Sequence, residues 1–212
     1  MKNIILLLSL TLCLLLSCTK EQGKPYISEY YIPNGLNTSQ YLDFSIASFS
    51  VSFAKGESFD GASLSNPQNH NKFEAFSTYY GDTNYKDNLG EFGWAKACIF
   101  PITGIAVTSD VDFGPHYKAG SLLNDLFSLR TRSFYEFIRH NYNEKYRLYE
   151  DSLASVDYSR LSLCQMGFVL STSPTSLPQG DFKLIVDVQF GPDPVTGDSI
   201  VLPPAVFEVS NN

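Results

Sequence analysis

Histidine, cysteine and charged side chains are all scarce in this sequence of 212 residues. It holds three histidines and four cysteines, and charged residues make up 17% of it. The His-Glu-x-x-His, Gly-x-Ser-x-Gly, phosphate-loop and Cys-x-x-Cys motifs are absent, which excludes the enzyme classes that carry them. We therefore predict a protein that is not an enzyme and has no cofactor. A hydrolase whose site only the fold assembles stays open as an alternative.

Basic residues are also in the minority. Lys and Arg number 15 against 22 Asp and Glu, so the net charge is −7 at pH 7. Proteins that bind nucleic acid neutralise its phosphates with clustered Lys and Arg, and no such cluster occurs in this sequence. The composition therefore predicts no nucleic-acid partner.

Only one long apolar run is present, from Ile4 to Leu16. A helix needs about 20 apolar residues to span a bilayer, so this run is too short for a stable anchor and fits a signal-peptide core. With Lys2 before it and Ser17–Cys18 after it, the segment resembles a bacterial lipoprotein signal. The resemblance implies that residues 1–17 are removed and that Cys18 carries the lipid, palmitate included. An ordinary secreted protein or an uncleaved anchor is the alternative.

The other cysteine in this region, Cys13, follows the bulky Leu12, whereas the lipoprotein peptidase needs a small residue there. Thr19 in place of Asp at the second mature position resembles lipoproteins sorted to the outer membrane. Lys20–Glu21 is similar to the short signal that sends Bacteroidota lipoproteins to the cell surface. These resemblances imply a chain held at the outer membrane through its N-terminal lipid and exposed at the cell surface.

Aromatic residues are abundant, with 13 Tyr and 16 Phe. Together with the low charge, they favour a β-rich extracytoplasmic domain. Residues 43–54 alternate apolar and serine side chains, as in a half-buried strand. We expect further strands at 73–80, at 161–171, at 182–190 and at 200–209, and two within 92–109 that are separated near Pro101. Residues 56–71 read as a polar loop, and we expect Cys164, Met166, Phe168 and Leu170 to share one face.

Ser133 and Glu136 have the spacing of a capping box, in which the serine caps a backbone amide and the glutamate reaches back to the serine's own amide. The spacing predicts an amphipathic helix over 134–150. We therefore expect a mainly β fold, a β-sandwich of immunoglobulin-like or related type with one amphipathic helical insertion. Its domains would be the signal peptide 1–17, a lipidated N-terminus and tether 18–42, and a β-rich globular domain 43–212.

Two cysteines remain in the predicted domain, Cys98 and Cys164. An oxidising compartment permits a disulfide between them, which would stabilise the fold by roughly 4 kcal/mol. Both lie in apolar sequence, however, and the alternative is a pair of buried thiols that act as small hydrophobic side chains.

A segment rich in aromatic and amide side chains begins at Tyr79. Flat rings stack on the apolar faces of sugars, and carboxylates and amides bind sugar hydroxyls. The segment therefore suggests a glycan-binding site, although an aromatic strand end followed by a turn is the commoner arrangement. The candidate glycan-binding residues are Tyr79, Tyr80, Asp82, Asn84, Tyr85 and Trp94.

Two other groups of residues could carry chemistry. Asp110, Asp112 and His116 would suit a divalent metal if the chain curled around it, but acids of this kind also shape turns by accepting backbone hydrogen bonds. Ser152 and Ser199 lie in Asp-Ser-aliphatic triplets, which resemble the acceptor of protein O-glycosylation in Bacteroidota.

The stretches 108–113 and 119–127, Thr-Ser-Asp-Val-Asp-Phe and Ala-Gly-Ser-Leu-Leu-Asn-Asp-Leu-Phe, resemble the central signature of an uncharacterised lipoprotein family of Bacteroidota. The family is a domain of unknown function, so the resemblance implies a location and no catalytic residue. We expect a lipid-anchored binding or accessory module whose partner is a glycan or a surface protein. A component of a surface complex or fimbria is the alternative among non-enzymes.

Overall fold

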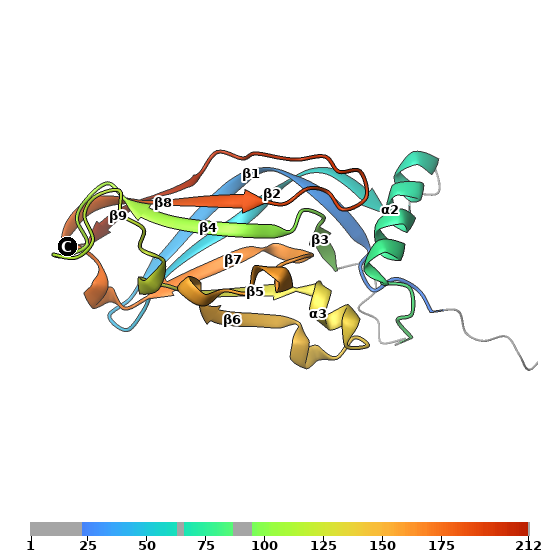
Figure 1. Ribbon diagram of the computed structural model, residues 1–212, viewed down its shortest axis with the longest axis horizontal. Helices are drawn as coiled ribbons and strands as arrows, with labels where there is room; N and C mark the ends of the chain where they lie inside the picture. Colours follow the sequence, from blue (N-terminus) through green and yellow to red (C-terminus); the bar gives the residue numbers. More distant parts are fainter. Residues whose placement is uncertain (1–22, 63–65, 87–94, 212) are drawn as a thin grey trace, which may run out of the picture.

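The computed structural model describes residues 23–62, 66–86 and 95–211. They form a mainly β fold of two sheets, sandwich-like as expected (Figure 1). The larger sheet has the strand order β3-β1-β2-β7-β5-β6 and the smaller one β4-β8-β9. Within the described ranges, no helix is both long enough and apolar enough to span a membrane.

The larger sheet is antiparallel except where the short strand β3 runs parallel to β1. Serines alternate with buried Phe49, Val51 and Phe53 along β2, so the predicted strand is confirmed. The strands of this sheet are β1 (Glu29–Leu42), β2 (Ala47–Asp60), β3 (Lys96–Cys98), β5 (Ser128–Ser133), β6 (Leu148–Ser152) and β7 (Cys164–Thr172).

The smaller sheet consists of β4 (Ile102–Ser109), β8 (Gly180–Phe190) and β9 (Ala205–Asn211). The predicted strand 182–190 is confirmed as part of β8. The strand predicted at 200–209 begins later, as β9, and pairs antiparallel with β8. Aromatic side chains join the two sheets. Phe49 of β2 meets Phe207 of β9 edge to face, with ring centroids 5.3 Å apart, and Phe53 meets Phe190 at 5.6 Å.

Side chains cover the outer edge of β4, which would otherwise offer unpaired backbone groups. The Asn124 amide donates to the carbonyl of Ile105 and accepts from the amide of Val107, at 2.8 and 3.0 Å. The hydroxyl of Tyr158 accepts from the amide of Ile105 at 3.0 Å. This edge is therefore protected from pairing with another chain.

The described residues form two α-helices where the sequence predicted one. Helix α2 (Pro67–Tyr80) occupies the predicted strand 73–80 and residues 67–71 of the predicted loop, and β2 extends over residues 56–60 of that loop. Both predictions were therefore wrong there. Its buried positions Phe73, Phe76, Ser77 and Tyr80 have helical spacing. The Asn66 side chain caps its first turn, and Gly81, with φ 71°, ends it.

The second helix, α3 (Phe134–Arg139), is shorter than the predicted helix over 134–150. It stops because Asn141 and Tyr142 take left-handed φ values of 52° and 59°. The chain then forms a 3-10 turn (Glu144–Tyr146) and enters β6. Further 3-10 turns lie at Asn124–Leu126, Leu153–Ser155, Tyr158–Arg160 and Pro174–Ser176.

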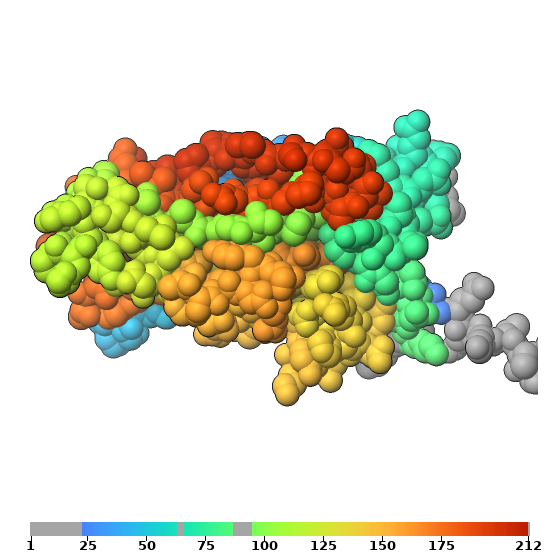
Figure 2. Space-filling model, viewed as in Figure 1, coloured from blue at the N-terminus to red at the C-terminus, as the bar shows by residue number. Residues whose placement is uncertain are grey.

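The predicted tether was wrong from residue 29 onward, because Glu29–Leu42 is a long strand paired with β2. Even before that strand, Lys24 pairs with Tyr85 through two backbone hydrogen bonds of 3.2 and 3.0 Å. The described chain therefore enters the domain at the end that carries α2. The loop after β4 and the C-terminus lie at the opposite end (Figure 1), and the loop covers much of that end in Figure 2.

Candidate functional site

The predicted aromatic segment begins at the end of α2, where two neighbouring tyrosines differ. Tyr79 is 60% exposed, whereas Tyr80 is 8% exposed and its hydroxyl donates to the carbonyl of Ile99 at 3.1 Å. Burial raises the pKa of the Tyr80 phenol well above its ordinary value. The two rings stand at 89° to each other, so they do not form one flat stacking surface.

Asp82 is fully buried and serves as an internal anchor for the chain that leads into β1. Its carboxylate accepts hydrogen bonds from the amides of Tyr26 at 2.8 Å and Ile27 at 2.9 Å. The Tyr30 hydroxyl lies 3.5 Å away. Burial raises the pKa of Asp82, and the hydrogen bonds oppose that rise only in part. The carboxylate is engaged by protein groups and cannot reach a ligand at the surface.

The rest of the segment also packs against the protein. Tyr85 is half-buried and meets Tyr26 edge to face, with ring centroids 4.8 Å apart. The backbone amide of Asn84 donates to the hydroxyl of Tyr142 at 3.2 Å. Trp94 lies outside the described residues. A glycan-stacking surface needs exposed and roughly coplanar rings, and the described part of the segment does not provide them. It holds α2 to the N-terminal chain instead.

The three candidate metal ligands are engaged separately. Asp110 accepts from the amide of Lys183 at 2.7 Å, and Asp112 accepts from the amide of Ala119 at 2.8 Å. Hydrogen bonding to Lys118 lowers the pKa of Asp112. His116 is exposed. In the ranges that the structure describes, no group of three His, Cys, Asp or Glu side chains could hold a metal ion. These acids shape the loop after β4.

Cys98 and Cys164 are both buried and both free. Each thiol lies 3.6 Å from a backbone carbonyl oxygen, that of Phe100 and that of Leu161 respectively. Burial raises the pKa of the Cys164 thiol to about 12 and that of Cys98 further, so neither is a thiolate at neutral pH. The two candidate O-glycosylation serines, Ser152 and Ser199, are both exposed.

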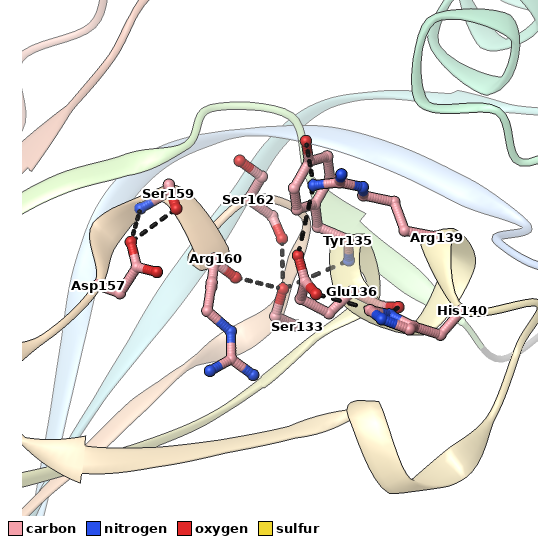
Figure 3. Close-up of polar contacts among 9 residues, drawn as sticks. All are labelled: Ser133, Tyr135, Glu136, Arg139, His140, Asp157, Ser159, Arg160 and Ser162. Carbon is pink, nitrogen blue, oxygen red and sulfur yellow. Dashed lines mark hydrogen bonds and ion pairs between the residues drawn. The ribbon is translucent and has the colours of Figure 1, made fainter.

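Ser133, Glu136 and His140 lie near one another in sequence but do not form a catalytic triad (Figure 3). The Ser133 hydroxyl accepts from the amide of Tyr135 at 3.3 Å, which confirms the predicted serine cap of α3. The same hydroxyl contacts the carbonyl oxygens of Arg160 and Ser162 at 2.9 and 2.7 Å.

The glutamate half of the predicted capping box was wrong, because the Ser133 amide donates to the carbonyl of Arg147. Glu136 turns instead toward Arg139, at 3.7 Å, and His140, at 3.5 Å (Figure 3). This cluster stabilises α3 and supplies no activated nucleophile.

A site that sequence reasoning missed lies on the face of the larger sheet that points away from the core. Here β2, β7, β5 and β6 form an open groove of about 490 Å³. We call it the outer-face groove. Its lining includes Ile46, Ser48, Ser50, Ser52, Arg130, Arg132, Leu148, Gln165, Met166, Val169 and Ser171.

Serine hydroxyls of β2 and β7 line part of the groove. Ser48 lies opposite Ser171, and their hydroxyls are 3.4 Å apart. Ser50 lies opposite Val169, which in turn lies opposite Arg130. Within the described chain, no side-chain hydrogen bond joins Ser50 or Ser52 to another residue. These hydroxyls are available to a ligand.

An irregularity in β7 places a large apolar side chain in the groove lining. Met166 is 68% exposed, although Phe168 beside it is buried. The register between β5 and β7 shifts between Thr131 and Ser133, as in a β-bulge. Our prediction that Met166 shares the buried face was therefore wrong, because this bulge turns its side chain outward.

Gly167 makes the bulge possible. Its φ is 126°, and a Cβ there would lie 2.0 Å from the carbonyl oxygen of Val51, so only glycine fits. The Thr131 hydroxyl donates to the Gly167 carbonyl at 2.6 Å, and the Tyr31 hydroxyl donates to that of Gln165 at 3.1 Å. The sequence signal that could have located the bulge is the glycine within an otherwise alternating strand.

Comparison of the sequence with protein-family models and with curated proteins, and of the structure with solved structures, finds no match.

Proposed function

We propose that this protein is a lipid-anchored extracytoplasmic module that binds glycans in its outer-face groove. The observation that carries the proposal is an exposed methionine set among unpaired serine hydroxyls, Ser50 and Ser52. A hydroxyl both donates and accepts hydrogen bonds, as the hydroxyls of a sugar do. Met166 and Leu148 offer apolar surface to the less polar face of a sugar ring.

A glycan-array screen of the full-length chain in detergent, followed by isothermal titration with the best ligand, would test this proposal. Met166→Ala should weaken binding of the best array ligand by about 1 kcal/mol, because the contact area of the methionine side chain is lost. Val206→Ala is the matched control, since Val206 is 42% exposed on β9, outside the groove. A chain that binds no glycan, or equal weakening by both variants, would contradict the proposal.

The anchor is the second part of the proposal. Cys18 precedes the first described residue, Gly23, by five positions, so a lipid on Cys18 would lie within about 18 Å of the α2 end of the domain. Cys18→Ala should abolish the incorporation of labelled palmitate and release the protein from the outer membrane. Palmitate that persists on this variant would contradict lipidation at Cys18.

One observation favours assembly as a second candidate function. The tip of the β1–β2 hairpin exposes a group of large apolar side chains, Tyr41, Leu42, Phe44 and Ile46, and Phe44 is 95% exposed. Exposed apolar groups of this kind are typical of protein contacts. Light scattering of the detergent-solubilised protein, compared with Phe44→Ser, would test whether this tip mediates self-association.

A further inference from the structure

The outer-face groove contains two arginines, Arg130 and Arg132, that form no ion pair among the described residues. Arg130 and Arg132 are alternate residues of β5 on the same face, so their Cα atoms lie about 7 Å apart along the strand. Both side chains are exposed and both line the groove. Glu150 faces Arg130 from β6, but no ion pair within 4.0 Å joins them. Throughout the described residues, neither arginine has a side-chain hydrogen bond or an ion pair.

Seven other basic side chains in the described residues form ion pairs with acidic side chains. Lys55 and Lys96 contact Glu29, Lys118 contacts Asp112, and Arg147 contacts Glu144. Among the described residues, in contrast, no Asp or Glu lines the groove. Even with Glu150 counted at its rim, the outer-face groove has more positive than negative charge, on a chain whose net charge is −7.

We infer that the ligand of the outer-face groove is an acidic oligosaccharide, whose carboxylate or sulfate groups are bound by Arg130 and Arg132. This inference rests on the proposed glycan-binding function. The planar guanidinium donates two parallel hydrogen bonds to a carboxylate or sulfate, which gives both affinity and orientation. The sugar rings would then extend over Met166 toward the hydroxyls of Ser50 and Ser52.

The position of the groove favours a glycan over an acidic peptide. Extended peptides commonly bind by adding a strand to an open sheet edge. The floor of the groove is β7 and β5, and both strands are hydrogen-bonded to neighbours on each side. No open backbone edge is therefore available at the floor, and recognition there depends on side chains. Serine hydroxyls beside arginines match a ligand that carries both hydroxyls and anionic groups.

Calorimetry of the full-length chain in detergent, with four probes of similar length, would test this inference. The probes are an oligogalacturonate, a sulfated heparin oligosaccharide, a neutral cello-oligosaccharide and an oligoglutamate. We expect at least one acidic oligosaccharide to bind more tightly than the neutral one, and to bind more weakly at higher salt.

Arg130→Gln and Arg132→Gln should each weaken that binding about tenfold or more, because each removes a charge-assisted hydrogen bond. Arg139→Gln is the matched control, since it removes the same charge from an exposed position on α3, and it should change the affinity less than twofold.

Tighter binding of the oligogalacturonate would indicate a carboxylate ligand, and tighter binding of the heparin oligosaccharide would indicate a sulfate ligand. Each of these results supports the inference. Binding of the neutral oligosaccharide alone would overturn the inference and leave the proposed glycan-binding function standing. Equal or tighter binding of oligoglutamate would identify an acidic peptide and overturn it too. If no saccharide binds, both the inference and the proposed function fail.

Discussion

The sequence suggests a binding site in the segment from Tyr79 to Tyr85 and none in the outer-face groove. Exposed side chains with no partner in the described residues, however, lie in the groove. The segment is rich in rings and polar side chains, yet Tyr80 and Asp82 are buried and bonded to the protein. The groove derives from an alternating strand that reads as ordinary structure, yet it exposes Met166 and the hydroxyls of β2.

The difference shows that residue type indicates a binding site only when the side chain has no partner inside the protein. A buried tyrosine hydroxyl or carboxylate that is already bonded contributes to stability. An exposed serine or methionine contributes little to stability and can contribute to binding. Substitutions of buried residues in the Tyr79–Tyr85 segment should therefore mainly lower stability, and substitutions in the outer-face groove should mainly lower affinity.

The largest effect is expected from Tyr80→Ala. Removing this buried ring should lower the free energy of unfolding by about 3–5 kcal/mol, because it leaves a cavity and an unsatisfied carbonyl at Ile99. Tyr79→Ala, at the exposed neighbouring position, should change it by less than about 0.5 kcal/mol. Urea unfolding measures both. A Tyr80→Ala protein as stable as the wild type would contradict the burial of Tyr80 and support the exposed aromatic surface that the sequence suggested.

Gly167→Ala should lower the free energy of unfolding by about 3 kcal/mol or more, because the new methyl group meets the Val51 carbonyl and the backbone is strained. Gly120→Ala is the control. Gly120 has φ 80°, with no heavy atom within 4 Å of its would-be Cβ, so strain alone should cost about 1 kcal/mol. Equal losses in the two variants would mean that the close approach of β7 to β2 is absent in solution.

Asp82→Asn should destabilise the protein by about 1–3 kcal/mol, because the amide cannot accept hydrogen bonds from both Tyr26 and Ile27. The pKa of Asp82 is raised on folding, so the folded state holds its proton more tightly than the unfolded state does. The contribution of Asp82 to stability is therefore complete below the ordinary pKa of about 4 and falls as the pH rises through the raised value.

The stability advantage of the wild type over Asp82→Asn should accordingly be largest in acid and smaller at neutral pH. Urea titrations at a series of pH values measure this difference directly. An advantage that grows as the pH rises would show that the hydrogen bonds to the carboxylate outweigh the effect of its burial.

The smallest effect on stability is expected from Met166→Ala. Met166 is 68% exposed, so the free energy of unfolding should change by less than about 0.5 kcal/mol. Leu170→Ala, on the same strand but fully buried, should cost about 2–5 kcal/mol. Thermal unfolding of the pair provides the comparison. A similar loss in both variants would place Met166 in the core, as simple alternation predicts.

The sequence by itself determined the elements whose burial follows a regular period. The alternation of Phe49, Val51 and Phe53 predicted β2, and that of residues 182–190 predicted β8, because successive side chains of a strand point to opposite faces. The serine at position 133 predicted the start of α3, because its hydroxyl satisfies a first-turn amide whatever the rest of the fold does.

Only the tertiary structure decided the candidate site. The period that predicts a strand placed Met166 in the core, and a bulge held by Thr131 and Tyr31, from two other strands, turned it outward. The same holds for Asp82, whose role depends on amides more than 50 positions away in sequence. Contacts between distant segments leave no local period in the sequence, so they became visible only when the strands were paired.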